Sequence, residues 1–359
     1  MDSRDTAGLS RVGVMASLRT LADFVEAGLV PDVERGALEA VTARYALALT
    51  PEMAALIDPA DPNDPIGRQF IPSLSELDRK PDEDADPIGD NIHSPVKGLV
   101  HRYLDRVLLK PLHTCPVYCR FCFRRESVGP EGAGSLSEAE LAAAFDYIAS
   151  HEDVFEIIVS GGDPFMLSPR RIMAIAEAAA RIAHVKIMRW HTRVPLVDPD
   201  RIGADLIAAL KKFSGAVYVA VHANHSREFT PAGQGALARL ADAGIVLVSQ
   251  SVLLKGINDD AKALEDLMRT FVANRVSPYY LHQGDLAPGT AHFRTTIAEG
   301  QVLMRNLRGR LSGIAQPTYV VDLPGGHGKV PVGPTYLGDD RIADPAGEWH
   351  AYPPNSSDI

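Results

Sequence analysis

The sequence of 359 residues predicts an α/β fold on a parallel β-sheet, and three observations lead to that class. Hydrophobic residues make up 46% of the chain and charged residues 23%, which is ordinary for a globular protein with a large core. From about residue 100, short apolar runs alternate regularly with helical patterns. Six such strand–helix units in succession imply right-handed crossovers, so the strands form either an open doubly wound sheet or an incomplete barrel.

Each strand candidate is followed by a helix candidate. The six predicted strands cover residues 106–111, 154–160, 185–190, 216–222, 245–251 and 276–281, and the six predicted helices cover residues 138–150, 169–183, 199–213, 231–243, 260–274 and 297–311. Three of the helices start at a capping oxygen followed by proline, namely at Ser168, Asp198 and Thr230. These three starts are therefore the best-defined boundaries in the prediction.

The chain divides into three predicted parts. Residues 1–98 hold helical patterns at 18–29 and 33–49, followed by an Asp- and Pro-rich stretch that is expected to wrap around the rest. Residues 99–315 form the α/β core. Residues 316–359 form a C-terminal segment, whose glycine-rich run is expected to be a surface loop.

Charge and cysteine content exclude several classes of protein. With 36 Lys and Arg against 46 Asp and Glu, the net charge is −10, which argues against a surface that coats nucleic acid. The sequence shows neither a secretory signal nor the roughly 20 apolar residues of a membrane span, so we expect a cytoplasmic protein without membrane or nucleic-acid partners. The cysteine count of 3 is odd, which excludes a fully paired disulfide framework.

Polar residues collect where the predicted strands end. The cysteines follow the first strand, residues 160–164 the second, 191–193 the third, 222–225 the fourth, 250–251 the fifth and 282–285 the sixth. Ligands of parallel α/β sheets bind at the carboxyl ends of the strands. We therefore expect one rim of the fold to carry a binding site.

Cys115, Cys119 and Cys122 are the strongest candidate ligands on this rim. A 4Fe–4S cluster normally takes four thiolates, so three cysteines at this spacing would leave one iron open. An open iron suggests catalysis rather than electron storage. From these residues alone, the alternative is a structural zinc site of three cysteines and one histidine, which would be His113 or a more distant residue.

The segment Cys115-Pro-Val-Tyr-Cys119-Arg-Phe-Cys122-Phe-Arg-Arg resembles the signature of radical S-adenosylmethionine (SAM) enzymes. Further segments resemble the lysine 2,3-aminomutase family in particular, and they begin at Asp61, Ser94, His101, Asp105, His292 and Pro324. The resemblance covers the chain from about residue 15 to 340. It implies a partial (β/α)6 barrel similar to a TIM barrel, a 4Fe–4S cluster on the three cysteines, SAM on the open iron, and pyridoxal 5′-phosphate (PLP).

The resemblance also implies residues that hold SAM. Ser160, Gly161, Gly162 and Asp163 match the glycine-rich strand end that contacts the methionine part of SAM, where absent side chains allow close backbone approach. His222, after the fourth strand, is expected to contact the nucleoside. Without the resemblance, the glycines form a structural turn and His222 is a satisfied buried histidine.

A second set of residues is implied for PLP. Lys329 matches the lysine that binds PLP covalently, which a lysine can do when its amine is made nucleophilic. The residues expected around the phosphate and ring are Arg102, Tyr103, Arg106 and Gln250. His327 departs from the glycine-only loop of the family.

For the substrate, the resemblance implies a bidentate clamp and an acidic pair. Arg124 is expected to bind the carboxylate, and Asp285 and Asp322 the distal ammonium, of L-lysine. The implied reaction converts L-lysine to β-lysine by PLP-assisted 1,2-amino migration, started by a 5′-deoxyadenosyl radical. Without the resemblance, Asp285 is a turn residue and Asp322 a strand-end cap.

Alternatives and partners complete the prediction. Within the family, one alternative is an enzyme that makes β-lysine for the modification of elongation factor P, and another is a 2,3-aminomutase of a different basic amino acid. An alternative from a different class is a non-catalytic protein that binds zinc or an iron–sulfur cluster. The expected protein partner is a reductant such as flavodoxin or ferredoxin. Larger family members carry additional cysteines for an intersubunit zinc site, so any homo-oligomer of this chain is expected to lack that site.

Overall fold

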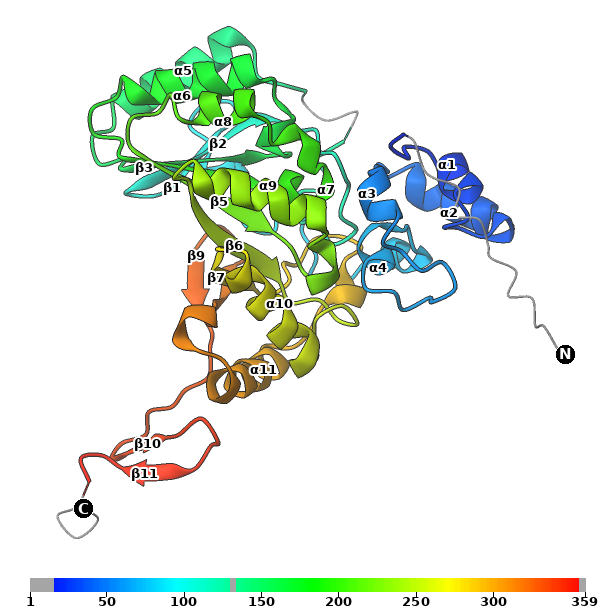
Figure 1. Cartoon of the computed structure of the whole chain (residues 1–359), viewed down its shortest axis with the longest axis vertical. Helices are drawn as coiled ribbons and strands as arrows, with labels where there is room; N and C mark the ends of the chain where they lie inside the picture. The colour runs from blue at the N-terminus through cyan, green and yellow to red at the C-terminus, as the bar shows by residue number, and fades with distance from the viewer. Residues whose placement is uncertain (1–15, 130–133, 355–359) are drawn as a thin grey trace, which may run out of the picture.

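The computed structural model describes residues 16–129 and 134–354, and it centres on a nine-stranded sheet with helices on its outer side (Figure 1). The strands are hydrogen-bonded in chain order, from β1 to β9. Their bounds are Leu99–Tyr103 (β1), Arg106–Leu112 (β2), Glu156–Gly161 (β3), Ile187–Thr192 (β4), Ala216–His222 (β5), Val246–Val252 (β6), Ser277–His282 (β7), Thr318–Leu323 (β8) and Gly328–Pro331 (β9).

The six predicted strands are confirmed as β2 to β7, and they are parallel. β8 adds a seventh parallel strand beside β7. β1 and β9 were not predicted, and they pair antiparallel with β2 and β8 at the two edges of the sheet. The sheet therefore forms a partial TIM-like barrel.

The helices follow the predicted order. Their bounds are Leu21–Glu26 (α1), Arg35–Thr42 (α2), Pro51–Ala54 (α3), Gly67–Phe70 (α4), Glu138–Ala149 (α5), Pro169–Ala180 (α6), Val194–Val197 (α7), Ala204–Leu210 (α8), Pro231–Asp242 (α9), Ala261–Ala273 (α10) and Ile297–Arg310 (α11). Ser168 and Thr230 cap α6 and α9 as predicted, since each side chain accepts a hydrogen bond from a backbone N–H in the first turn.

The helix predicted over residues 199–213 is wrong at its start. Pro199–Arg201 forms one 3-10 turn, the Asp198 side chain makes no capping hydrogen bond, and α8 begins only after Gly203. The reason lies just upstream, where all four residues of α7 are buried. After this buried turn the backbone of Asp198 has φ −152° and ψ 65°, which is not the extended geometry of a helix N-cap, so the Asp-Pro pair starts only a 3-10 turn.

The main core lies between the sheet and its outer helices. Trp190, Phe165 and Phe271 are fully buried there. Removing side chains of this size from water contributes about 1.5–3 kcal/mol each. This packing fixes the strands, and hence the positions of the residues that follow them.

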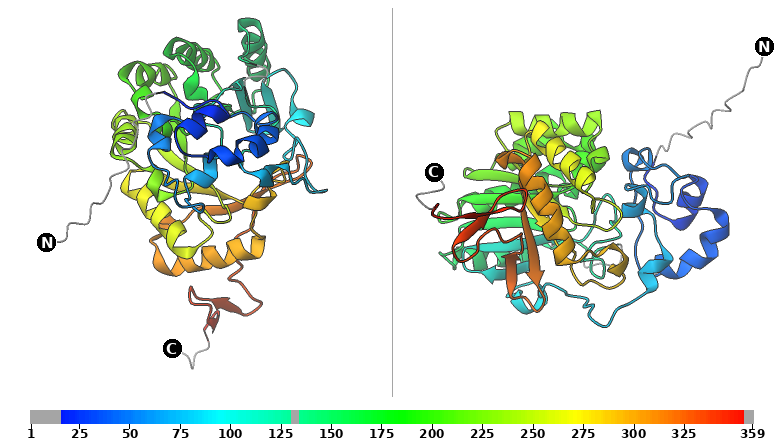
Figure 2. Two further views of the ribbon diagram at one scale, coloured as in Figure 1. Left: turned by 90° about the vertical axis from the view of Figure 1, so that its right-hand side faces the viewer. Right: turned by 90° about the horizontal axis from the view of Figure 1, so that it is seen from below.

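The N-terminal segment has a smaller core of its own. Phe24 and Phe70 are buried in it, together with Val117 and Val197 from the barrel. Val117 lies among the cysteines and Val197 follows β4, so the segment covers the carboxyl ends of the strands. Figures 1 and 2 show α1 to α4 at this end of the barrel.

The C-terminal part of the chain contributes to two sheets. β8 and β9 belong to the barrel sheet, whereas β10 (Arg341–Ala343) and β11 (Trp349–Ala351) form a separate hairpin (Figure 1). Within the two described ranges, no helix is both long enough and apolar enough to cross a lipid bilayer.

Candidate active site

Two adjoining cavities are built on the strands: one lies at their carboxyl ends, and the other reaches back to Arg106 at the start of β2. The lysine cavity, lined by Lys329, encloses about 1060 Å³, and the cysteine cavity, lined by the three cysteines, about 910 Å³, counting space open to solvent. The cavities share the lining residues Phe123, Arg124, Ser160, His191, His222, Gln250, Val252 and Asp285. Every site residue predicted from the sequence lines at least one of the two.

The glycines after β3 fix the start of the cysteine loop, residues 113–125. Gly162 donates its N–H to the Leu112 carbonyl at 2.8 Å, and Asp163 donates to the Thr114 carbonyl at 3.0 Å. A Cβ on Gly162 would lie 2.4 Å from the Thr114 oxygen, and one on Gly161, whose φ is +103°, would lie 2.5 Å from the Leu112 oxygen. Glycine is therefore required here by the chain itself, whatever ligand approaches from the cavity.

We predict that Gly162→Ala destabilises the protein. The φ of Gly162 is not in the left-handed region, so the effect comes from the overlap of the new Cβ with the Thr114 oxygen. Overpacking of this kind lowers the free energy of unfolding by about 1–3 kcal/mol. Urea denaturation measures it, with Gly203→Ala as the matched control because a Cβ there meets nothing within 4 Å. Equal stability of the two variants would contradict the explanation.

The three thiols suit a positively charged iron cluster. Burial raises the pKa of all three, to about 11 for Cys122, where neighbouring Cys119 adds to the effect. A cationic metal favours the thiolate form and so reverses this effect. In the described ranges, no three histidine, cysteine or acidic side chains are arranged to hold a single metal ion. Cluster ligands bind separate irons, so thiols spread around one cavity are compatible with a 4Fe–4S cluster.

A buried ion-pair network from the N-terminal segment holds the cysteine loop. Arg120, between Cys119 and Cys122, donates to both carboxylate oxygens of Glu76, and Arg125 donates to the same group. The Glu76 side chain is fully buried. The Arg120 N–H also donates to the Gln69 carbonyl at 2.8 Å. Sequence reasoning missed these residues, because no motif marks Gln69 and the Ser-x-x-Glu capping box that ends at Glu76 does not reveal its distant partners.

Asp163 ties the ends of β3 and β4 together. Its carboxylate accepts hydrogen bonds from the Thr192 hydroxyl at 2.7 Å, the Arg193 N–H at 2.7 Å and the Phe165 N–H at 3.0 Å. Burial raises the pKa of this carboxyl group, although the hydrogen bonds oppose the rise. Its oxygens are thus engaged within the protein, on the wall of the cysteine cavity.

A histidine pair lies where the two cavities meet. The Nε2 of His222 is 3.4 Å from the Nδ1 of His191. Burial lowers the pKa of both rings, to about 3 for His222, so both are neutral at neutral pH. The Nε2 of His191 is buried without a hydrogen-bond partner among the described residues. Sequence reasoning placed His191 on the rim without a role, and the structure adds it to the site.

Lys329 lies on the edge strand β9, so the surface loop predicted for the glycine-rich run holds for the turn at 324–327 and is wrong for 328–331. Lys329 pairs with Asp322 across β8 and β9, and its N–H donates to the Tyr103 hydroxyl at 2.7 Å. The turn between these strands contains Gly325 and Gly326, which both have positive φ. The hairpin therefore sets the direction of the Lys329 side chain.

The 89–93 segment holds this turn from outside. A Cβ on Gly89 would lie 2.7 Å from the Cα of Gly326, and the Nε2 of His93 is 3.0 Å from the Gly326 carbonyl oxygen. His327, which departs from the glycine-only loop, is exposed and lines neither cavity. It is not among the residues with positive φ, so a side chain fits at this position.

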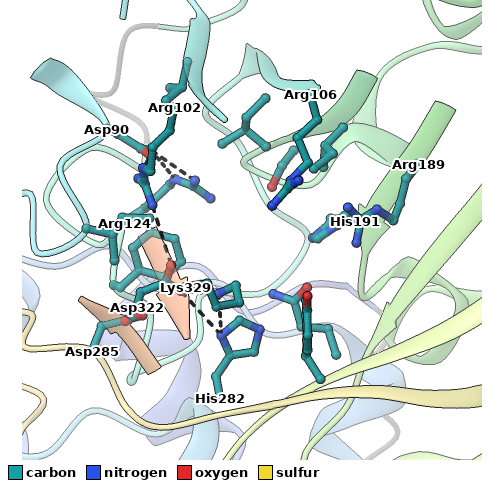
Figure 3. A pocket seen from close by; sticks show the side chains of 18 of the residues that line it. Asp90, Arg102, Arg106, Arg124, Arg189, His191, His282, Asp285, Asp322 and Lys329 are labelled. Carbon is teal, nitrogen blue, oxygen red and sulfur yellow. Dashed lines mark hydrogen bonds and ion pairs between the residues drawn. The ribbon is translucent and has the colours of Figure 1, made fainter. Parts of the chain in front are cut away.

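The amine of Lys329 lies in the lysine cavity between Asp322 and His282 (Figure 3). It forms an ion pair with Asp322 and is 3.2 Å from the Nδ1 of His282. Burial would raise the pKa of Asp322, but its hydrogen bonds and the lysine charge outweigh that effect and lower it. Burial and the lysine charge lower the pKa of His282 to about 4, so this ring is neutral. His282 is a further residue without a predicted role.

Asp285 faces the same space, and its carboxylate accepts no hydrogen bond from any of the described residues. Burial and, to a smaller extent, the negative charge of Asp322 raise the pKa of Asp285 to about 7. At neutral pH this carboxyl group is therefore poised to ionise when a cation arrives. Figure 3 shows Asp285 and Asp322 next to each other.

Asp90 gathers three cations on the wall of the lysine cavity, and it is the most important residue that sequence reasoning missed. Arg124 donates to one carboxylate oxygen at 3.0 and 3.1 Å, Lys110 donates to the same oxygen at 3.2 Å, and Arg102 donates to the other at 3.3 Å. Three cations on one carboxylate leave positive charge for a bound anion. Asp90 lies in the irregular Asp- and Pro-rich stretch, where no periodicity marks it.

The remaining predicted residues line the wall near β1 and β2. The guanidinium of Arg106 lies 3.7 Å from the centre of the Tyr103 ring. The Nε of Arg102 is buried and has no acceptor in the described part of the chain, as expected for a group that binds an external anion. Arg189, which was not predicted, also lines the lysine cavity and is paired with Glu156 at 2.8 Å.

Comparison with known families supports the sequence resemblance. The model of the radical SAM superfamily matches residues 109–268, which include the cysteine loop. A second model, described as lysine-2,3-aminomutase, matches residues 304–341, which include Asp322 and Lys329.

Full-length relatives extend the match over most of the chain. The L-lysine 2,3-aminomutase of Clostridium subterminale is 41% identical over 309 residues, covering 86% of this chain and 74% of that protein. A putative L-lysine 2,3-aminomutase of Aquifex aeolicus is 41% identical over 310 residues, covering 86% of this chain and 83% of that protein. A glutamate 2,3-aminomutase of Clostridioides difficile is 36% identical over 304 residues, covering 85% and 71%. This similarity, together with the cysteine loop and the lysine on β9, shows that the chain belongs to the lysine 2,3-aminomutase family of radical SAM enzymes.

Proposed function

We propose that this protein converts L-lysine to β-lysine, with a 4Fe–4S cluster, SAM and PLP as cofactors. The observation that carries the proposal is the lysine cavity, which brings Lys329 together with the guanidinium of Arg124 and the carboxylates of Asp285 and Asp322 (Figure 3). These groups match an amine for PLP, a clamp for the α-carboxylate and an acidic site for the distal ammonium of lysine.

The residues of the cysteine cavity fit the cluster and SAM. Cys115, Cys119 and Cys122 would hold three irons and leave the fourth for SAM. The residues available to SAM on the same wall are Ser160, Gly161, Gly162, Asp163, His191 and His222. When bound, SAM at the reduced cluster supplies a hydrogen-abstracting radical, and PLP supplies a conjugated ring that delocalises an unpaired electron.

The residues of the lysine cavity fit PLP. Arg102 has a buried N–H that meets no acceptor in residues 16–129 and 134–354, and Arg106 adds a second guanidinium for a phosphate. Gln250 lies where the two cavities meet, so PLP and SAM would lie against a common wall. Tyr103 fixes the backbone of Lys329 by a hydrogen bond of 2.7 Å.

Arg124 and the acidic pair would set the position of the substrate. Arg124 is held by two hydrogen bonds to Asp90, at 3.0 and 3.1 Å, which orient its planar group. A substrate carboxylate at Arg124 and an ammonium at Asp285 would fix both ends of a lysine molecule. Held in this way, the substrate would present one carbon for hydrogen abstraction, with water kept from the reacting atoms.

The ion pair between Lys329 and Asp322 links substrate binding to the reactivity of the amine. A lysine amine reacts as a nucleophile only when it is free, and in the ligand-free protein the Lys329 amine is engaged in an ion pair with Asp322. The distal ammonium of the substrate would compete with Lys329 for Asp322. Neutral His282, 3.2 Å from Nζ, is placed to accept a hydrogen bond from the displaced amine.

An anaerobic assay with a panel of amino acids tests the proposal. L-Lysine, L-arginine and L-glutamate are each supplied with PLP, SAM and dithionite, and β-amino acids and 5′-deoxyadenosine are quantified. We expect β-lysine from lysine, and glutamate turnover at least about 100-fold slower, because its side-chain carboxylate would face two acidic groups. Faster turnover of arginine would reassign the substrate to another basic amino acid. If 5′-deoxyadenosine forms without any β-amino acid, the aminomutase assignment fails while the radical chemistry stands.

The small-molecule substrate does not supply the electron that reduces the cluster. A flavodoxin or ferredoxin fits this requirement, because low-potential one-electron carriers of this kind match the range of iron–sulfur potentials. We therefore propose such a carrier as the reductant of this enzyme.

A further inference from the structure

Arg193 is a buried guanidinium that contacts a cysteine of the cluster site. It follows β4, and its Nη1 donates a hydrogen bond to the Sγ of Cys119 at 3.0 Å. Only 8% of its side chain is exposed. Its backbone N–H is bound by Asp163 at 2.7 Å, so the end of β4, rather than a mobile loop, fixes where the side chain starts.

Glu228 balances the charge of Arg193 and is itself fully enclosed. The Nη2 of Arg193 donates to one oxygen of Glu228 and, at 3.0 Å, to the side chain of Gln69. The other oxygen of Glu228 accepts the N–H of Asn224 at 2.8 Å and of His225 at 2.9 Å. These donors fix the carboxylate of Glu228 in place. Glu228, Gln69 and Cys119 together hold the guanidinium of Arg193.

One donor of this guanidinium is unused. The Nε of Arg193 is buried and has no acceptor among the described residues, and the residue lines the cysteine cavity. A buried N–H without a partner is rare in proteins and marks a place where a ligand atom completes the hydrogen bonding. A sulfur-rich cluster on the neighbouring cysteines would bring further acceptors close to this donor.

We propose that Arg193 is a positioning residue of the cluster, and that its charged hydrogen bond to the Cys119 thiolate raises the reduction potential, while Glu228 limits the rise. The inference rests on the proposed function, because it takes Cys119 as a cluster ligand. Reduction adds negative charge to the cluster, and hydrogen bonds to its sulfur atoms and nearby positive charge stabilise that form. Glu228 has the opposite effect through its negative charge.

A redox titration followed by electron paramagnetic resonance tests the sign of both effects. The full chain is reconstituted anaerobically, and the reduced-to-oxidised ratio of the cluster is measured at the midpoint potential of the unmodified protein. We expect the ratio to fall about tenfold in Arg193→Gln, which for one electron is about 59 mV. In Glu228→Gln the ratio should rise, because the opposing charge is removed.

Two further variants separate this effect from damage to the fold. Arg193→Gln leaves Glu228 buried without its main partner, so the double variant Arg193→Gln/Glu228→Gln removes both charges together and should lie between the two single variants. Arg227→Gln is the matched control, because Arg227 pairs with Asp64 at 2.7 Å and lines neither cavity. Its ratio should stay within about twofold of the unmodified protein.

The outcomes distinguish the inference from the proposed function. If cluster-loaded variants keep the ratio of the unmodified protein, or if both single variants shift it in the same direction, the role of Arg193 is refuted. If Arg193→Gln takes up no cluster, the shifts of Glu228→Gln and of the double variant decide. If the unmodified protein forms no 4Fe–4S signal at all, the proposed function fails instead.

Discussion

Replacing Lys329 with alanine will abolish the formation of β-lysine and leave the cleavage of SAM measurable. Lys329 is the amine of the lysine cavity, so its loss removes the group that would bind PLP covalently. The cysteine cavity does not include Lys329, so the cluster and SAM keep their binding residues. We expect β-lysine formation to fall by more than about 1000-fold, while 5′-deoxyadenosine still forms slowly. Chromatography of both products checks this result.

Two variants control for the loss of positive charge. Lys329→Arg keeps a cation beside Asp322 but cannot form the covalent bond with PLP, and it should be as inactive as the alanine variant. Lys211→Ala removes an exposed lysine that lines neither cavity, and it should keep full activity. Substantial β-lysine formation by Lys329→Ala would refute the role of this residue.

Replacing Asp285 with asparagine will weaken lysine binding and remove a step in the pH profile. Loss of one partner of a buried charge pair costs about 2–5 kcal/mol, and each 1.4 kcal/mol is about tenfold. We therefore expect kcat/KM for lysine to fall by about 30-fold to a few thousandfold, mainly through KM. Steady-state kinetics at pH 8 measure this loss. Asp339→Asn, at an exposed position outside both cavities, is the matched control.

The pH dependence follows from the raised pKa of Asp285. In the ligand-free protein, burial and the charge of Asp322 raise this pKa to about 7, and only the ionised carboxylate attracts an ammonium group. At pH values below this pKa, Asp285 must lose one proton for each lysine molecule that binds. We therefore expect kcat/KM to rise about tenfold per pH unit below the pKa and to level off above it. The ammonium of lysine stays charged in this range, because its pKa is about 10.4. If Asp285→Asn keeps the same step, another group is responsible for it.

The parts of the structure that depend on local pattern could be predicted from the sequence. The six strands from β2 to β7 coincide with short apolar runs, and α6 and α9 are capped by Ser168 and Thr230, where a capping oxygen precedes proline. The carboxyl ends of parallel strands converge, so the predicted site residues line the same pair of cavities.

The parts that depend on contacts between distant segments could not be predicted. Glu76 lies in a short 3-10 turn and Asp90 in the Asp- and Pro-rich stretch, and neither local pattern shows that the N-terminal segment brings them to Arg120 and Arg124. β9 was not recognised within the glycine-rich run, because it is a short edge strand that pairs with a single neighbour, β8. The need for glycine at position 162 could not be predicted from the chain's own residues either, because the nearby Thr114 oxygen that excludes a Cβ is known only from the fold.

Supplying L-lysine labelled with ¹⁵N at the α-amine tests the central claim most directly. In the anaerobic reaction with PLP, SAM and dithionite, the account predicts β-lysine in which nuclear magnetic resonance finds the label in the nitrogen bound to the β-carbon. Lys329→Ala should give none of this product. Label released as ammonia, or a β-lysine whose nitrogen carries no label, would contradict the account.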